Sequence, residues 1–205
     1  MRMPSQQPPA SGAAPAAAPL QHHLFFAVLP DAAALHAASD LAQSLIVRHD
    51  LQAQVRAPRL HATLLSLGWE DQLSESHLAW ARAAAARVRA PSFELRFDHV
   101  LSFPRAPRAK RPCVLCAPAE PQLGFLRLYE ALHAALWSQV PDLQDLQDLP
   151  RAPHITPHMT LCYSRQSVPE QAVAPLAWTV QSFALLHNRH GSSGPYELLG
   201  QWPLE

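Results

Sequence analysis

The chain has 205 residues, of which 48% are hydrophobic and 16% charged, a balance typical of a globular protein with a sizeable core. Its formal net charge is +0, so a nucleic-acid ligand would need a local basic site rather than a general electrostatic attraction. No stretch approaches the roughly 18 consecutive apolar residues of a membrane-spanning helix. We therefore expect a cytoplasmic protein with no membrane attachment.

The N-terminal stretch differs in composition from the rest of the chain. Residues 1–21 are rich in Pro, Ala, Gln and Ser, and prolines interrupt every apolar run. Such a segment does not bury enough apolar surface to fold, and Arg2 alone does not make the basic region of a signal peptide. We expect residues 1–21 to be a disordered extension and residues 22–205 to form a single two-lobed domain.

Apolar runs and capping residues predict the elements of the first half. A short apolar run ended by Pro30 predicts a buried strand over residues 24–29. Asp31 is a suitable N-cap for a helix that extends to about residue 48. A strand over residues 60–67 and an alanine-rich helix over residues 74–89 follow.

The second half repeats this order of elements. Alternating apolar residues predict a strand over residues 93–97, and Pro121 suits the first turn of a helix that follows another strand. The remaining strands are expected at residues 113–117, 158–163, 178–186 and 196–202. Together, the elements predict a duplicated α+β architecture with a cleft between two lobes.

The most informative pattern is a His-x-Thr-Leu tetrapeptide that occurs twice, at residues 61–64 and 158–161. Random placement of the 12 histidines and four threonines predicts about 0.2 His-x-Thr triplets, and the chain has three. In a strand, residues i and i+2 point the same way, so each copy presents an imidazole and a hydroxyl on one face. Two such pairs facing each other across a cleft would form a general acid–base arrangement.

The third triplet begins at His154 and is followed by Pro157, which cannot donate to a sheet ladder. We interpret His154 as a loop residue at the approach to the second motif strand. A zinc site built from His154, His158 and His61 is an alternative. Pro153 and Pro157 disfavour the helix that such spacing needs, and no carboxylate lies nearby, so we expect no metal.

These features resemble the 2'-5' RNA ligase and RNA 2',3'-cyclic phosphodiesterase family of the 2H phosphoesterase superfamily. Besides the two motifs, the resemblance rests on the stretches LFFA at 24–27, LHATL at 60–64, TPHMTL at 156–161 and YELLG at 196–200. It covers about residues 24–204. It implies an α+β, duplicated two-lobed fold, with antiparallel sheets lining a central cleft and helices outside.

The resemblance also implies an activity and roles for residues. The activity is metal-independent hydrolysis of 2',3'-cyclic phosphate ends of RNA without a cofactor, with reversible 2'-5' RNA ligation as a further reaction. His61 and His158 would be the acid and the base, because two imidazoles hold opposite protonation states near neutral pH. Thr63 and Thr160 would bind the non-bridging phosphate oxygens. The sequence does not decide which histidine is the acid; we begin with His61 in that role, and we expect a monomer.

Two positions depart from the family pattern. Many members have an aromatic residue where this chain has Ser66, and often a basic residue where it has Tyr163. Loss of that cation would weaken phosphate binding. We therefore expect the Tyr163 hydroxyl or the nearby Arg165 to contact the phosphate instead.

Two further features are candidates for contact with RNA. The loop after residue 103 is basic and either guides RNA or is only a solvated connection; its cations are Arg105, Arg108, Lys110 and Arg111. Trp69 follows the first motif and either stacks a nucleobase beside the cleft or packs in the core.

Two other functions stay open at this point. The same site would serve a phosphodiesterase that acts on a small cyclic phosphate nucleotide, and the lining of the cleft decides between the two substrates. A non-catalytic module that binds RNA ends would keep the pocket, although it has no need for a matched acid and base. The sequence does not indicate whether the product carries a 2'- or a 3'-phosphate.

Overall fold

A computed structural model describes residues 21–106, 109–138 and 155–205 of the chain. The disordered extension expected for residues 1–21 falls, except for Gln21, outside the described residues, as do Arg108 and His154. Among the described residues, no helix is both long enough and apolar enough to cross a membrane.

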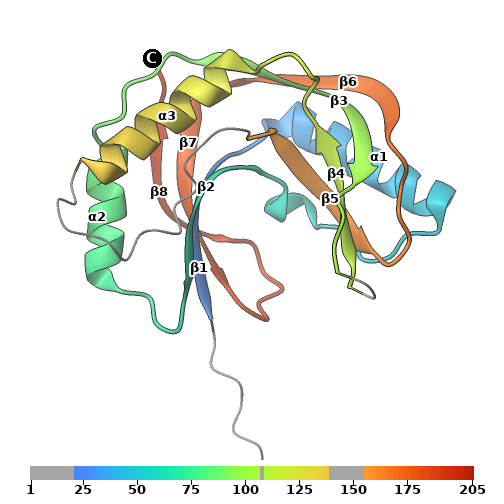
Figure 1. Cartoon of the computed structure of the whole chain (residues 1–205), viewed down its shortest axis with the longest axis horizontal. Helices are drawn as coiled ribbons and strands as arrows, with labels where there is room; N and C mark the ends of the chain where they lie inside the picture. The colour runs from blue at the N-terminus through green and yellow to red at the C-terminus, as the bar shows by residue number, and fades with distance from the viewer. Residues whose placement is uncertain (1–20, 107–108, 139–154) are drawn as a thin grey trace, which may run out of the picture.

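Eight antiparallel strands form one sheet in the order β6-β3-β4-β5-β2-β1-β7-β8 (Figure 1). The strands are β1 His22–Val28, β2 Ala62–Glu70, β3 Phe93–Ser102, β4 Arg111–Cys116, β5 His158–Ser164, β6 Gln171–Val180, β7 Ser182–Arg189 and β8 Glu197–Pro203. The helices are α1 Ala32–His49, α2 Glu75–Ala85 and α3 Leu123–Trp137, with a short 3-10 turn, η1, at Ala57–Arg59.

The sheet consists of two four-stranded halves that meet at a single residue pair. β2 and β5 are the inner strands of the halves, and Ala62 opposite Met159 is the pairing between them. The units β1-α1-β2 and β4-α3-β5 have the same order and the same place in their halves. The predicted fold class is thus confirmed, and the antiparallel sheets of the prediction are the halves of one continuous sheet.

Local sequence explains where the helices begin. The Asp31 side chain accepts a hydrogen bond from the Ala34 backbone N–H (2.8 Å) at the start of α1, and Ser74 caps α2 in the same way. α1 packs against β5 and β6, whereas α3 packs against β2 and β3 and also contacts α2. Figure 1 shows α1 on one side of the molecule and the pair α2 and α3 on the other.

The core lies between these helices and one face of the sheet. Its largest fully buried side chains include Phe26, Phe97, Phe125, Tyr129 and Phe183. At Gly124, α3 approaches β3 so closely that a Cβ would lie 2.3 Å from the Cβ of Phe93. The three cysteines, Cys113, Cys116 and Cys162, are free and buried.

The chain after β5 differs from the prediction. One strand was expected over residues 178–186, but the structure has two, β6 and β7, which are separated at Gln181. β6 contains Pro175 and is an edge strand, so the missing N–H of the proline breaks no central ladder. The helix predicted at residues 74–89 is also shorter, because α2 ends at Ala85.

Candidate active site

The two His-x-Thr motifs meet where the halves of the sheet join. Ala62 and Met159, the residues that pair between β2 and β5, are the middle residues of the two motifs. Both are fully buried on the core side. Their neighbours in each strand therefore face the opposite side, and antiparallel pairing sets His61 beside Thr160 and His158 beside Thr63. The four predicted residues thus share one face.

The two imidazoles are held in the same way. The Nδ1 atom of His61 lies 2.8 Å from the backbone oxygen of Arg59, and that of His158 lies 2.9 Å from the backbone oxygen of Thr156. A carbonyl oxygen only accepts, so Nδ1 carries the proton in both rings. Each Nε2 is then left to accept a proton when the ring is neutral, or to donate one when it is charged.

Motif residues line two cavities, which share one residue. The first, of about 610 Å³, is lined by His61, Thr63 and Thr160 from the motifs. The second, of about 390 Å³, is lined by His158 and again by Thr63. A group bound against Thr63 therefore lies between the two imidazoles.

His61 sits in a more apolar surrounding than a free imidazole. The rings of Phe25 and Tyr196 lie 5.1 and 5.2 Å from its own ring. Burial is the main cause that lowers the pKa of His61 to about 4, and positive charge on His158 and Arg59 adds to this effect. The hydrogen bond to the Arg59 backbone oxygen acts in the opposite direction but does not offset it. His61 is therefore neutral at pH 7.

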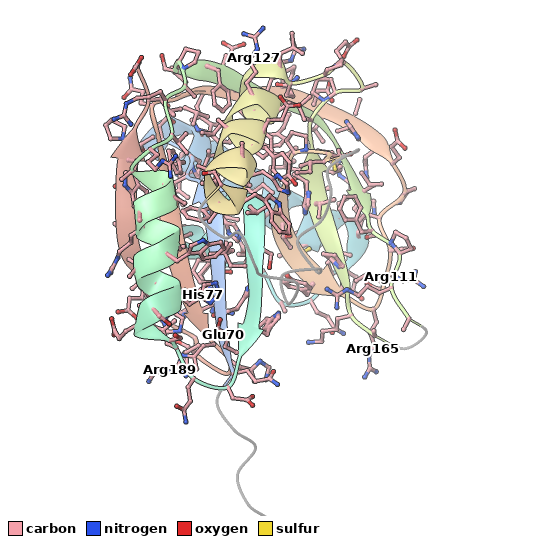
Figure 2. All side chains as sticks on the ribbon, turned by 60° about the vertical axis from the view of Figure 1, so that its left-hand side comes forward. Glu70, His77, Arg111, Arg127, Arg165 and Arg189 are labelled. Atoms are coloured by element: carbon pink, nitrogen blue, oxygen red, sulfur yellow. The ribbon has the colours of Figure 1, made fainter. Side chains whose placement is uncertain are left out.

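Tyr163 lines the first cavity, whereas Arg165 does not. Burial raises the pKa of Tyr163, and the nearby Thr160 side chain acts in the opposite direction without offsetting it, so the Tyr163 hydroxyl stays a protonated donor at neutral pH. Arg165 follows the end of β5 and is exposed, and Figure 2 shows it near Arg111 at one end of the molecule. Of the two residues predicted to contact the phosphate, the structure brings only Tyr163 to the motifs.

Trp69 packs on the cavity wall rather than in the core. It is 52% exposed, lines the first cavity, and stacks on His23 with ring centroids 4.5 Å apart. His23 stacks in turn on Phe25, which contacts His61. The Nε2 atom of His23 also lies 2.8 Å from the hydroxyl of Ser66. The chain therefore supplies an aromatic wall from β1 and the end of β2.

Arg59 is a site residue that sequence reasoning missed. Its backbone oxygen orients His61, and its guanidinium donates to the Ser192 backbone oxygen and the Asn188 side-chain oxygen, each at 2.8 Å. The same guanidinium lies 4.3 Å from the ring centre of Tyr196. These contacts join segments more than a hundred residues apart. The only local signal was the position of Arg59 two residues before the first motif histidine.

The family model of the 2'-5' RNA ligase superfamily matches residues 29–192, which contain both motifs and most of the sheet. The chain belongs to the 2'-5' RNA ligase superfamily. No curated protein matches it. Members of this superfamily are phosphoesterases and RNA ligases, so the chain is of an enzyme family.

Solved structures show the same fold. TT0787 of Thermus thermophilus is 26% identical and superimposes with a TM-score of 0.71, covering 88% of this chain and 97% of that chain. Escherichia coli LigT in complex with 3'-AMP is 22% identical, has a TM-score of 0.60, and covers 91% and 99% of the respective chains. Escherichia coli LigT in complex with phosphate is 22% identical and has a TM-score of 0.57, and the match covers 90% of this chain and 98% of that chain.

Proposed function

We propose that the protein is a metal-independent phosphodiesterase that opens the 2',3'-cyclic phosphate at the end of an RNA to a phosphomonoester. The observation that supports this proposal is that the two imidazoles make the same hydrogen bond through Nδ1. Both have Nδ1 committed to the carbonyl oxygen two residues earlier, so both offer Nε2 to the cleft. A pair of imidazoles with free Nε2 atoms, one on each side of a shared threonine, suits a reaction that needs a base and an acid at once.

In the proposed reaction, water attacks phosphorus and one P–O bond of the ring breaks. The base takes a proton from the attacking water as the new P–O bond forms. The acid gives a proton to the ribose oxygen that leaves, so the product is a phosphomonoester beside a free hydroxyl. The Thr63 and Thr160 hydroxyls, with that of Tyr163, donate to the non-bridging oxygens.

We assign His61 as the base and His158 as the acid for ring opening, which reverses our starting assignment. The reason is the pKa of His61, which burial lowers to about 4, so its Nε2 is unprotonated at neutral pH. Ligation is the same ring opening with the 5'-hydroxyl of a second strand in place of water: the base takes the proton of that hydroxyl, the bond between phosphorus and the 3' oxygen breaks, and the acid protonates the 3' oxygen, which leaves a 2'-5' linkage. The two groups exchange roles only when that linkage is cleaved again.

Two observations favour a nucleotide ligand over an unrelated phosphoester. The cavity of His61 has an exposed Trp69 stacked on His23, and flat rings of this kind stack on nucleobases. The fold neighbour LigT has been determined with 3'-AMP and with phosphate. A small cyclic nucleotide would fill the same site and is the second candidate substrate.

Turnover in excess chelator tests the proposal. The full chain is incubated at pH 5 to 9 with a 2',3'-cyclic nucleotide and with an RNA oligomer that ends in a cyclic phosphate. We expect hydrolysis of the oligomer without added metal. Turnover of the mononucleotide alone would select the second candidate, and hydrolysis that stops in chelator would support the metal-dependent alternative. Tight binding of the oligomer by folded protein without turnover would indicate a non-catalytic binding module.

A further inference from the structure

The cavity that contains His61 holds more positive charge than one phosphodiester needs. Three arginines line it, Arg56, Arg59 and Arg105. Among the described residues that line this cavity there is no Asp or Glu, although the chain as a whole has equal numbers of acidic and basic residues. A cyclic phosphate carries a single negative charge, so three uncompensated guanidinium groups exceed what it neutralises.

The three arginines differ in how they are held. Arg59 is half-buried and fixed by two hydrogen bonds and the Tyr196 ring, close enough to His61 to lower its pKa. Arg56 and Arg105 are exposed, and within the described part of the chain neither guanidinium has a hydrogen-bond or ion-pair partner. One cation therefore belongs to the immediate surroundings of His61, and two are left for another anion.

The two unpartnered cations come from two different segments of the chain. Arg56 precedes η1, whereas Arg105 lies in the loop between β3 and β4 and acts electrostatically on Tyr163. Guanidinium groups recognise phosphate oxygens through paired N–H donors, and two of them lining one cavity can bind the oxygens of a single phosphate. The same cavity is lined by Trp69, so it offers both an aromatic ring for a base and guanidinium groups for a phosphate.

We propose that Arg56 and Arg105 bind a second phosphate, the one attached to the 5' oxygen of the nucleoside that carries the cyclic phosphate. This inference rests on the proposed function and makes it specific: the substrate has at least two phosphates, as an RNA end does. An internucleotide phosphodiester and a 5'-terminal phosphate share this chemistry.

Three substrates test the second phosphate: adenosine 2',3'-cyclic phosphate, its 5'-phosphorylated form, and the dinucleotide ApA that ends in the same cyclic phosphate. We expect kcat/KM at least tenfold higher for the dinucleotide than for the adenosine substrate. An equal gain for the 5'-phosphorylated form would show that any 5' phosphate suffices, and a gain for the dinucleotide alone would identify the internucleotide phosphodiester. Equal kcat/KM for all three substrates would overturn the proposal.

Variants connect the preference to the residues. In Arg56→Ala and Arg105→Ala, the ratio of kcat/KM between the dinucleotide and the adenosine substrate should fall towards one. The dinucleotide reaction should also depend more steeply on salt than the adenosine reaction, by a slope of about −0.7 in log(kcat/KM) against log salt concentration per phosphate contact. This difference in slope should disappear in the two variants. Arg165→Ala is the matched control, since it removes an exposed arginine outside the cavity. A preference that persists in both cavity variants would contradict the assignment.

Equilibrium binding separates this inference from the proposed function. The probes are the hydrolysed dinucleotide and the hydrolysed mononucleotide, each ending in a phosphomonoester, and their binding is measured by isothermal titration calorimetry. Tighter binding of the dinucleotide, lost in Arg105→Ala, would support the second phosphate site even if no substrate is turned over. Equal affinities would overturn it even if both substrates are hydrolysed.

Discussion

His61 makes the folded protein sensitive to acid. Its pKa is about 4 in the folded chain, whereas the ordinary value is 6.5. Below pH 6.5 the unfolded chain binds a proton that the folded chain does not, so the free energy of unfolding decreases as the pH falls towards 4. At about 1.4 kcal/mol per pKa unit, full passage through this window costs roughly 3 kcal/mol, a large part of the stability of a typical domain.

The substitution His61→Asn isolates this effect. The asparagine side-chain N–H can replace Nδ1–H as donor to the Arg59 oxygen, and it does not titrate. Urea unfolding of wild type and variant at pH 7.5 and pH 4.5 gives four free energies. We expect the wild type to lose about 2.5 kcal/mol more than the variant between the two pH values. A difference below about 0.5 kcal/mol would refute the argument that burial keeps His61 neutral.

Three further predictions follow from the site and the core. With bis(4-nitrophenyl) phosphate, whose leaving group departs without a proton, His158→Ala should lose less than about tenfold in kcat, whereas His61→Ala should lose about 10² or more. A large loss in kcat for His158→Ala with a small loss for His61→Ala would indicate that His61 is the acid. Trp69→Ala should raise KM for cyclic nucleotides of all four bases by about tenfold with kcat little changed, and Trp69→Phe should keep most of the affinity; steady-state kinetics that show no change in KM would exclude stacking. Gly124→Ala should lower the free energy of unfolding by about 1–3 kcal/mol, because the new Cβ would overlap Phe93. A rise in the urea midpoint, as helix propensity alone predicts, would show that α3 moves freely away from β3.

The motif residues could be predicted because their arrangement is local. Residues two positions apart in a strand point to the same face of the sheet. The sequence therefore predicts that His61 lies beside Thr63 and that His158 lies beside Thr160. That the motifs pair through Ala62 and Met159 is a matter of tertiary structure. Nothing in the sequence around either motif indicates which strands are neighbours.

The other cavity residues illustrate the limit of local reasoning. Arg59, Tyr196 and Arg105 come from η1, the segment before β8 and the loop between β3 and β4. Proximity in sequence favoured Arg165 as the cation near the second motif, yet a loop about sixty residues earlier brings Arg105 to Tyr163. Charge alone did not distinguish Arg105 from the other cations of its loop.

The strand that was missed has a physical explanation too. Residues 171–177 carry weak alternation and include Pro175, which argues against a central strand. At a sheet edge neither feature is a disadvantage, and β6 pairs with β3 over most of its length. A prediction from sequence needs the sheet order before it can treat a proline in this way.

In the proposed mechanism His61 and His158 act as one acid–base pair. The most direct measurement is kcat for hydrolysis of the cyclic-phosphate oligomer, in excess chelator, by wild type, His61→Asn, His158→Asn and the double variant. Each single substitution keeps a donor for the backbone carbonyl and removes Nε2. We expect kcat to fall by about 10² or more in each single variant, and to be hardly lower in the double variant than in either single variant. A single variant with unchanged kcat would contradict the acid–base pair. So would a double variant whose loss in kcat is the product of the two single losses.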